Sequence, residues 1–252
     1  MRDPLVTIVA KGPDDGDLLI DTQERTVYVR ETEYPALWAR VSGLLRSTHQ
    51  TSYNMLLLGN PGIGKSMSLN FLVMSCISAF FEDVAIVVVA QGRVDVFAGG
   101  QRQYIATDPS FFPSHQQVDA VIDSMSPGTS GIQRRLLLLH DVKLTGLDFQ
   151  VNFHGGLSDI VLPSKARKYV VTCVLAASPN NPFVKTFSKL SAQYHPSHIP
   201  TATSPGLEAV SQHCLPTWTN DEMRKIASTI PQTKFEERWK VCGGVPRHWN
   251  MT

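Results

Sequence analysis

A run of eight residues near the end of the first quarter of the chain has the composition and spacing of a phosphate-binding loop. The pattern G-x-x-x-x-G-K-[ST] is completed by Gly59, Asn60, Pro61, Gly62, Ile63, Gly64, Lys65 and Ser66. In such a loop the backbone N–H groups and the N-terminal end of the next helix point at a di- or triphosphate. Lys65 would reach the terminal phosphates, and the Ser66 hydroxyl would bind Mg²⁺. We predict that these residues, with the adjoining Met67, bind ATP or ADP.

The segments on either side of this loop support the prediction. Residues 53–58 form a short apolar run, which predicts a strand buried on both faces. Residues 65–80 carry apolar side chains at mostly helical spacing. The predicted order is therefore strand, glycine loop, helix. The alternative is a glycine-rich turn that ends in Lys-Ser by chance.

The remaining elements predict an α/β fold, a P-loop NTPase with a mostly parallel sheet flanked by helices and a small C-terminal helical lid. Strands are predicted over 5–10, 18–20, 26–31, 84–90, 134–141 and 168–177, a hairpin over 93–106, and helices over 35–45, 116–123, 219–230 and 234–242. The helix over 219–230 begins at a capping box, Thr219 with Glu222, and the helix over 234–242 is stopped by Gly243 and Gly244. We predict three parts: an N-terminal segment over 1–50, the core over 51–206 and the lid over 207–252.

Polar residues follow two of the predicted buried strands, where they would meet the loop at one edge of the sheet. Mg²⁺ needs a carboxylate at the tip of a neighbouring strand, and Asp141 is the candidate. Two registers are open: Asp141 is the metal ligand and Val142 replaces a catalytic base, or His140 is at the metal position and Asp141 is the base. Ser178 and Asn180 end the next strand, where they would sense the γ-phosphate or simply form a turn.

Composition and charge exclude several classes of protein. The chain has 252 residues, of which 42% are hydrophobic and 18% charged, as expected for a compact domain. The net charge of +1 does not indicate a nucleic-acid partner, and no uncharged run is long enough to span a membrane. The four cysteines are far apart without C-x-x-C spacing, which predicts free thiols in a reducing intracellular compartment.

Several segments, taken in order, resemble one family of NTPase domains. They are 27–31, the loop 59–66, 177–180, 215–219 with Glu222, and Gly-Gly-Val-Pro-Arg at 243–247. Together they resemble the domain shared by the Crinkler effectors of oomycetes and the retrotransposon-hot-spot proteins of trypanosomes. The resemblance covers residues 25–250 and implies a fold of the AAA+ and STAND class, with delivery into a host cell as a family property.

The resemblance also implies roles that local chemistry does not establish. It places Arg30 and Pro246 beside the adenine, where the proline would pack on the base. The chemistry of Arg247 itself would let its planar guanidinium approach a phosphate. Taken alone, this last segment is a helix stop followed by a turn. We therefore expect a slow, Mg²⁺-dependent ATPase that works as a conformational switch, with a protein partner or self-association setting its rate. The alternative is a non-catalytic effector or adaptor whose site is empty or holds ADP permanently.

Overall fold

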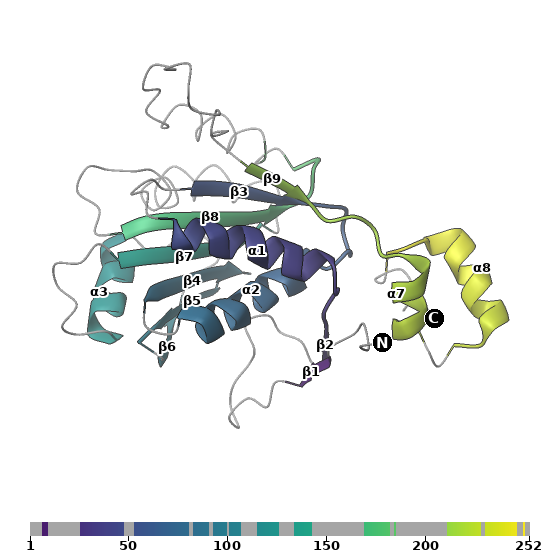
Figure 1. Cartoon of the computed structure of the whole chain (residues 1–252), viewed down its shortest axis with the longest axis horizontal. Coiled ribbons are helices and arrows are strands. Elements are labelled where there is room, and N and C mark those ends of the chain that lie inside the picture. The colour runs from purple at the N-terminus through teal and green to yellow at the C-terminus, as the bar shows by residue number, and fades with distance from the viewer. Residues whose placement is uncertain are drawn as a thin grey trace, which may run out of the picture.

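The computed structural model describes residues 7–9, 26–47, 53–80, 83–90, 93–99, 101–106, 115–125, 134–142, 169–181, 184, 211–227, 230–245 and 249. The predicted strand over 18–20 lies outside these residues. Within them, a central sheet is flanked by helices, and two further helices lie beyond one end of the sheet (Figure 1). The predicted α/β class is confirmed.

The sheet contains seven strands in the order β6-β5-β4-β7-β8-β3-β9. The strands are β3 (Tyr53–Leu58), β4 (Val84–Ala90), β5 (Arg93–Ala98), β6 (Gln101–Ala106), β7 (Arg134–Asp141), β8 (Tyr169–Ala177) and β9 (Ser211–Cys214). All neighbours from β4 to β9 pair in parallel, whereas β5 and β6 form an antiparallel hairpin at the edge. Parallel strands bring their carboxyl ends to one edge, and this edge holds the loop after β3.

Helices cover both faces of the sheet. Helices α1 (Glu33–Arg46) and α2 (Lys65–Phe80) pack on one face, and α3 (His115–Met125) packs on the other (Figure 1). Alternate residues of each strand therefore enter different cores. This double burial explains why β4 is a continuous apolar run, with all seven residues buried.

The second N-terminal strand is shorter than the sequence predicts. Strands β1 (Thr7–Val9) and β2 (Thr26–Tyr28) form a separate two-stranded antiparallel sheet. The predicted strand over 26–31 ends at Tyr28, because Val29 and Arg30 enter the interior instead of continuing the ladder. Arg30 is only 1% exposed, so its charge is buried.

The C-terminal segment contains a strand that the sequence analysis does not predict. Strand β9 pairs with β3 at the second edge of the sheet, inside the segment 207–252 that was assigned to the lid. Helices α7 (Asn220–Ile226) and α8 (Gln232–Cys242) follow it, and the predicted capping box at Thr219 is present. The helical part therefore begins only after β9.

The four cysteines are free thiols, of which Cys76 and Cys173 are buried. Among the described residues, no helix is long and apolar enough to cross a membrane.

Candidate nucleotide-binding site

The loop between β3 and α2 has the predicted setting, with β3 ending at Leu58 and α2 beginning at Lys65. Gly62 and Gly64 have φ angles of 83° and 99°, a region that other residues rarely adopt. A Cβ atom on Gly59 would overlap the end of the Ile63 side chain and lie 3.2 Å from the carbonyl oxygen of Leu215, so it would fit only if these neighbours shifted. The strand, glycine loop and helix give this chain the architecture of a P-loop NTPase.

Lys65 lies over the loop itself. Its Nζ atom donates hydrogen bonds to the carbonyl oxygens of Gly59 at 2.7 Å and Asn60 at 2.9 Å. Partial burial lowers the pKa of Lys65, and the charge of Asp141 opposes this effect. Two carbonyl oxygens at the start of the loop thus hold the ammonium group, and a bound anion would be a further hydrogen-bond acceptor for it.

The structure brings Ser66 and Asp141 together. The Ser66 hydroxyl donates a hydrogen bond of 2.6 Å to Oδ2 of Asp141, which is 6% exposed. The two strands concerned are not neighbours as the sequence analysis expected, because β8 lies between β3 and β7. Asp141 reaches Ser66 because it points to the α2 face, like Leu137 and Leu139 on the same strand.

His140 belongs to the other face of the sheet. Leu136 and Leu138, which alternate with the α2-facing residues, pack in the core under α3. Burial lowers the pKa of His140 to about 4, so the imidazole is neutral near pH 7. Of the two registers left open above, this geometry favours the one in which Asp141, beside Ser66, is the metal ligand.

The end of β8 forms a turn at the same edge of the sheet. Ala177 is in register with Leu58, and Ala176 is in register with Asp141, so Ser178 follows β8 between the two. The backbone N–H of Asn181 donates to the carbonyl of Ser178 at 2.9 Å. Asn180 is exposed within this turn. The nucleotide-sensing roles of Ser178 and Asn180 stay predictions.

Arg30 joins the N-terminal segment to the C-terminal part. Its guanidinium donates to both carboxylate oxygens of Glu222, at 3.0 and 3.2 Å, and to the carbonyls of Pro216 and Thr217. Burial by itself raises the pKa of Glu222, but the bonds from Arg30 and Thr219 and the Arg30 charge lower it overall. The predicted place of Arg30 beside a base stays a prediction. In the structure, the hydrogen-bond partners of its guanidinium are Glu222, Pro216 and Thr217.

Two contacts to the loop were not predicted from the sequence. The indole Nε1 of Trp218 donates to the carbonyl of Ile63 at 3.0 Å, and the hydroxyl of Tyr34 donates to the carbonyl of Gly64 at 3.0 Å. Trp218 belongs to the segment 215–219 noted above, but nothing in the sequence of that segment indicates which group the indole contacts. Pro246 and Arg247 lie outside the described residues, so their predicted roles stay open.

The donor set at the loop is small. In the described part of the chain, no group of three or more His, Cys, Asp or Glu residues could hold a metal ion. Mg²⁺ is commonly held by one or two carboxylates together with phosphate oxygens and water. The pair of Ser66 and Asp141 fits that mode, in which a nucleotide completes the coordination.

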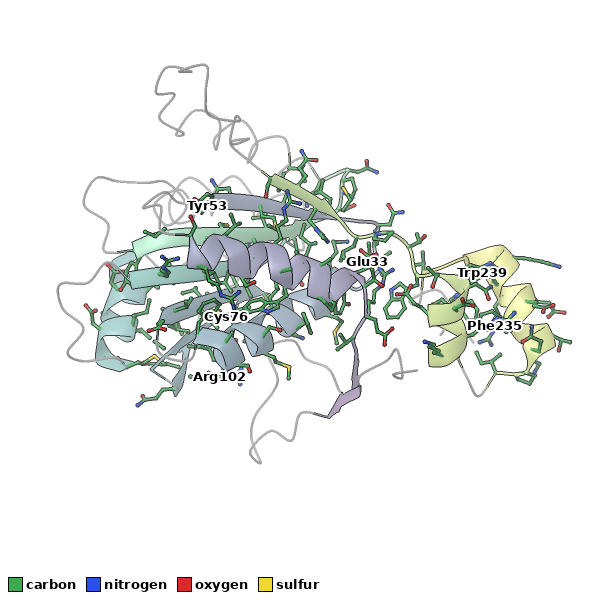
Figure 2. All side chains as sticks on the ribbon, viewed as in Figure 1. Glu33, Tyr53, Cys76, Arg102, Phe235 and Trp239 are labelled. Atoms are coloured by element: carbon green, nitrogen blue, oxygen red, sulfur yellow. The ribbon has the colours of Figure 1, made fainter. Side chains whose placement is uncertain are left out.

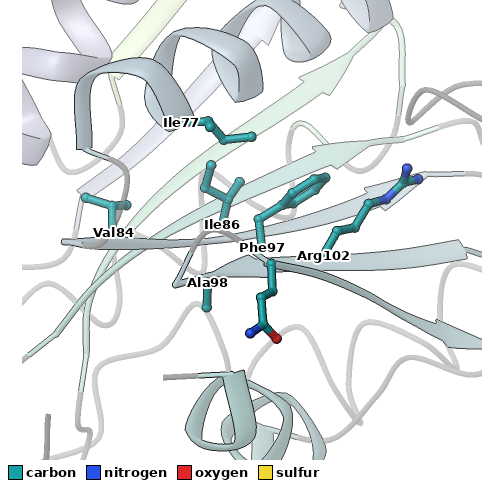
Figure 3. A pocket seen from close by; sticks show the side chains of 7 residues that line it. Ile77, Val84, Ile86, Phe97, Ala98 and Arg102 are labelled. Atoms are coloured by element: carbon teal, nitrogen blue, oxygen red, sulfur yellow. The ribbon is translucent and has the colours of Figure 1, made fainter. Parts of the chain in front are cut away.

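A separate cavity of about 250 Å³ lies between the second half of α2 and the β5–β6 hairpin (Figure 3). Its walls are mostly apolar, and they are formed by Ile77, Val84, Ile86, Phe97, Ala98, Gln101 and Arg102. Arg102 is ion-paired with the buried Asp95 at 3.0 Å. None of the lining residues belongs to the phosphate loop, so this cavity is not part of the candidate site.

No protein-family model matches the chain, and no curated protein is similar to it. Among solved structures, the ORC2 protein of Aeropyrum pernix in ADPNP–ADP complexes is 16% identical with a TM-score of 0.37. The match covers 79% of this chain and 50% of that one. Rif2 in complex with the C-terminal domain of Rap1 is 13% identical with a TM-score of 0.38, covering 79% and 60%. Likenesses this distant support no conclusion about function.

Proposed function

We propose that this chain binds ATP with Mg²⁺ at the loop of residues 59–66 and hydrolyses it slowly as a conformational switch. The observation that carries the proposal is the 2.6 Å contact between Ser66 and Asp141. It joins the hydroxyl that ends the phosphate-binding pattern to a carboxylate at the end of a buried strand. A hydroxyl of the loop and a carboxylate at the end of another strand are the two protein ligands that P-loop NTPases offer to Mg²⁺.

Mg²⁺ would supply charge neutralisation between the phosphates when it is bound. Ser66 and Asp141 would hold it, and their direct hydrogen bond would open to admit it. Lys65 would shift part of its hydrogen bonding from Gly59 and Asn60 to phosphate oxygens. The loop amides would supply the remaining donors, because they sit at the positive end of α2.

Slow turnover follows from the residue after Asp141. A catalytic carboxylate that activates water would follow the metal carboxylate directly, and here the position is Val142. Val142 packs against the core under α3, and its backbone N–H bonds to the carbonyl of Ala176 at 3.0 Å. An arginine supplied by a partner or a second copy could raise the rate by about 10³–10⁵.

The switch would act through the C-terminal helices. Helices α7 and α8 are attached to the loop through Trp218 and to the N-terminal segment through Arg30. A change in the loop on nucleotide binding would therefore reach these helices directly. The proposal includes the resemblance to the Crinkler and retrotransposon-hot-spot domains. This is a resemblance of motifs only, since no family model matches the chain.

A non-catalytic interaction module is the second candidate, and Val142 in the place of a base favours it. Such a protein would keep the fold while its site held ADP permanently or stayed empty. Purified protein that carries nucleotide which never exchanges with added ATP would support this candidate against the ATPase.

The test of the proposed function is thermal unfolding of the wild type and Lys65→Ala with and without Mg²⁺·ATP. A ligand at ~100 times its Kd stabilises the native state by about 2.7 kcal/mol. For a chain of this size we expect a rise in Tm of about 5–10 °C in the wild type. Lys65→Ala should show no rise, because the ammonium group that binds the terminal phosphates is lost.

Each shift is measured from the variant's own Tm without nucleotide, because Lys65 also holds the carbonyls of Gly59 and Asn60. Lys240→Ala, on the exposed side of α8, is the matched control for the loss of one lysine and should keep the full shift. A wild type that gains no stability, with no nucleotide bound on purification, would contradict nucleotide binding. An equal shift in Lys65→Ala would contradict the site.

A further inference from the structure

Two consecutive carbonyl groups of the phosphate loop are held from outside by side chains of other segments. Trp218, from the segment after β9, donates its indole N–H to Ile63, and Tyr34, from the first turn of α1, donates its hydroxyl to Gly64. The carbonyl of Gly64 also accepts the first hydrogen bond of α2, from Ser68 at 2.9 Å. The two contacts therefore lie where the loop becomes a helix.

The planarity of the peptide bond links these contacts to the phosphate site. In a trans peptide the C=O of one residue and the N–H of the next point in opposite directions. A carbonyl of Ile63 drawn toward Trp218 turns the N–H of Gly64 the other way, and Tyr34 does the same for the N–H of Lys65. Within the described part of the chain, no hydrogen bond from these two N–H groups to a backbone carbonyl of a loop or turn is found. They are the kind of donors that a phosphate requires.

Both side chains are rigidly placed. Tyr34 is fully buried against Phe71, at 5.6 Å between ring centroids, and a Cβ atom on Gly64 would come within 2.6 Å of its hydroxyl oxygen. Burial raises the pKa of Tyr34 far above its usual value, so the phenol keeps its proton and remains a donor.

The Trp218 side chain is 5% exposed. The guanidinium of Arg30 lies over the Trp218 ring, 5.0 Å from its centroid. The backbone N–H of Trp218 donates to the carbonyl of Gly244 at 2.9 Å. Contacts from Arg30 in the N-terminal segment and from Gly244, just after α8, therefore fix Trp218, so its indole N–H is held on the loop.

We propose that Tyr34 and Trp218 are positioning residues of the phosphate site, which aim the N–H groups of Gly64 and Lys65 at the nucleotide by holding the preceding carbonyls from behind. This inference rests on the proposed function, because it assigns the two residues a role in nucleotide binding. It makes the phosphate site a product of three segments: the loop, the start of α1 and the segment after β9. The ligand class is any linear polyphosphate, with or without a base.

The test uses Tyr34→Phe and Trp218→Phe, each of which removes the donor and keeps an aromatic ring. Binding of Mg²⁺·ATP and of Mg²⁺·tripolyphosphate is measured by calorimetry on the full chain. The net value of one buried hydrogen bond predicts a loss of affinity of about 3- to 10-fold in each variant. The loss should be equal for the two ligands, because the effect lies at the phosphates.

Two matched controls separate positioning from stability. Trp249 is also 5% exposed and donates its indole N–H to a backbone carbonyl, that of Gly243, at 3.0 Å. Its ring packs on Phe235 in the helical part, and its indole bonds to no residue of the loop. Tyr53 bonds to Ser47 at the far end of β3 (Figure 2). Trp249→Phe and Tyr53→Phe should lose similar stability and keep wild-type affinity for both ligands.

The outcomes distinguish this inference from the proposed function. Wild-type affinity in both Tyr34→Phe and Trp218→Phe, with binding lost in Lys65→Ala, would overturn the positioning role and leave nucleotide binding standing. A loss for ATP without a loss for tripolyphosphate would also overturn it, because the effect would then lie at the base. A wild type that binds neither ligand would overturn both proposals.

Discussion

Gly244 lies against the backbone of Trp218, and its replacement by alanine should loosen the C-terminal helices from the sheet. A Cβ atom at position 244 would overlap the carbonyl oxygen of Trp218 and lie 2.9 Å from its backbone nitrogen. Ordinary contact begins at 3.4 Å, so the two backbones would have to move apart. No side-chain rotation can relieve this clash, because the obstructing atoms are backbone atoms.

The magnitude follows from what the separation breaks. The hydrogen bond from the Trp218 N–H to the Gly244 carbonyl, now 2.9 Å long, would be lost, at about 1 kcal/mol. A forced backbone shift in a packed region adds about 1–3 kcal/mol. We therefore expect Gly244→Ala to lower stability by about 2–4 kcal/mol. In a chain of 252 residues this corresponds to a fall in Tm of about 5–15 °C.

Gly43→Ala is the matched control for the same chemical change. Gly43 lies on the exposed side of α1, and a Cβ atom there would meet nothing within 4 Å. Alanine in a helix interior is more favourable than glycine by about 0.5–1 kcal/mol, so this variant should be slightly more stable than the wild type.

Thermal unfolding followed by circular dichroism gives the first comparison, and limited proteolysis shows whether α7 and α8 become cleavable before the sheet unfolds. Either a lower Tm or earlier cleavage in Gly244→Ala is the expected result. If the variant matched the wild type in both assays, the packing of residue 244 on Trp218 would be refuted.

Two further predictions concern the edge of the sheet beside the loop. Asp141→Asn keeps a hydrogen-bond acceptor for Ser66 but removes the charge, so Mg²⁺-dependent ATP turnover should fall by more than ATP affinity; equal turnover in the variant would move the metal role to another residue. His140 makes folding sensitive to acid: it takes up a proton in the unfolded chain below its usual pKa of 6.5, but in the folded chain only near its lowered pKa of about 4. Stability should therefore be full above pH 6.5 and fall between pH 6.5 and 4, by at most about 3 kcal/mol, and His140→Gln should lose that part of the pH dependence in urea unfolding measured across this range.

Local patterns in the sequence predicted the elements of the core closely. The strand over 53–58, the loop and the helix over 65–80 have the predicted bounds, and so do the strands over 84–90 and 134–141. These segments are either apolar throughout or periodic, because each packs against one or two layers of the core. The capping box at Thr219 was also predicted, because it depends on two residues only three positions apart, Thr219 and Glu222.

Strand β9 shows where local patterns fail. Its sequence, Ser-Gln-His-Cys, contains no run of apolar or β-branched residues, and its burial alternates between partly buried and exposed. It is a strand because the backbone of β3 offers it hydrogen bonds along the second edge of the sheet. Pairing with a neighbour, rather than intrinsic preference, decides the conformation of such a segment.

The sequence by itself determined the phosphate loop, its strand and its helix, because their pattern is contiguous and each residue's role depends on its immediate neighbours. The sequence also predicted that Asp141 would lie beside the loop, because it follows a buried strand. Only the tertiary structure decided the contacts of Trp218 with Ile63, 155 residues away, and of Arg30 with Glu222, 192 residues away. Both contacts depend on the pairing of β9 with β3, which does not follow from spacing along the chain.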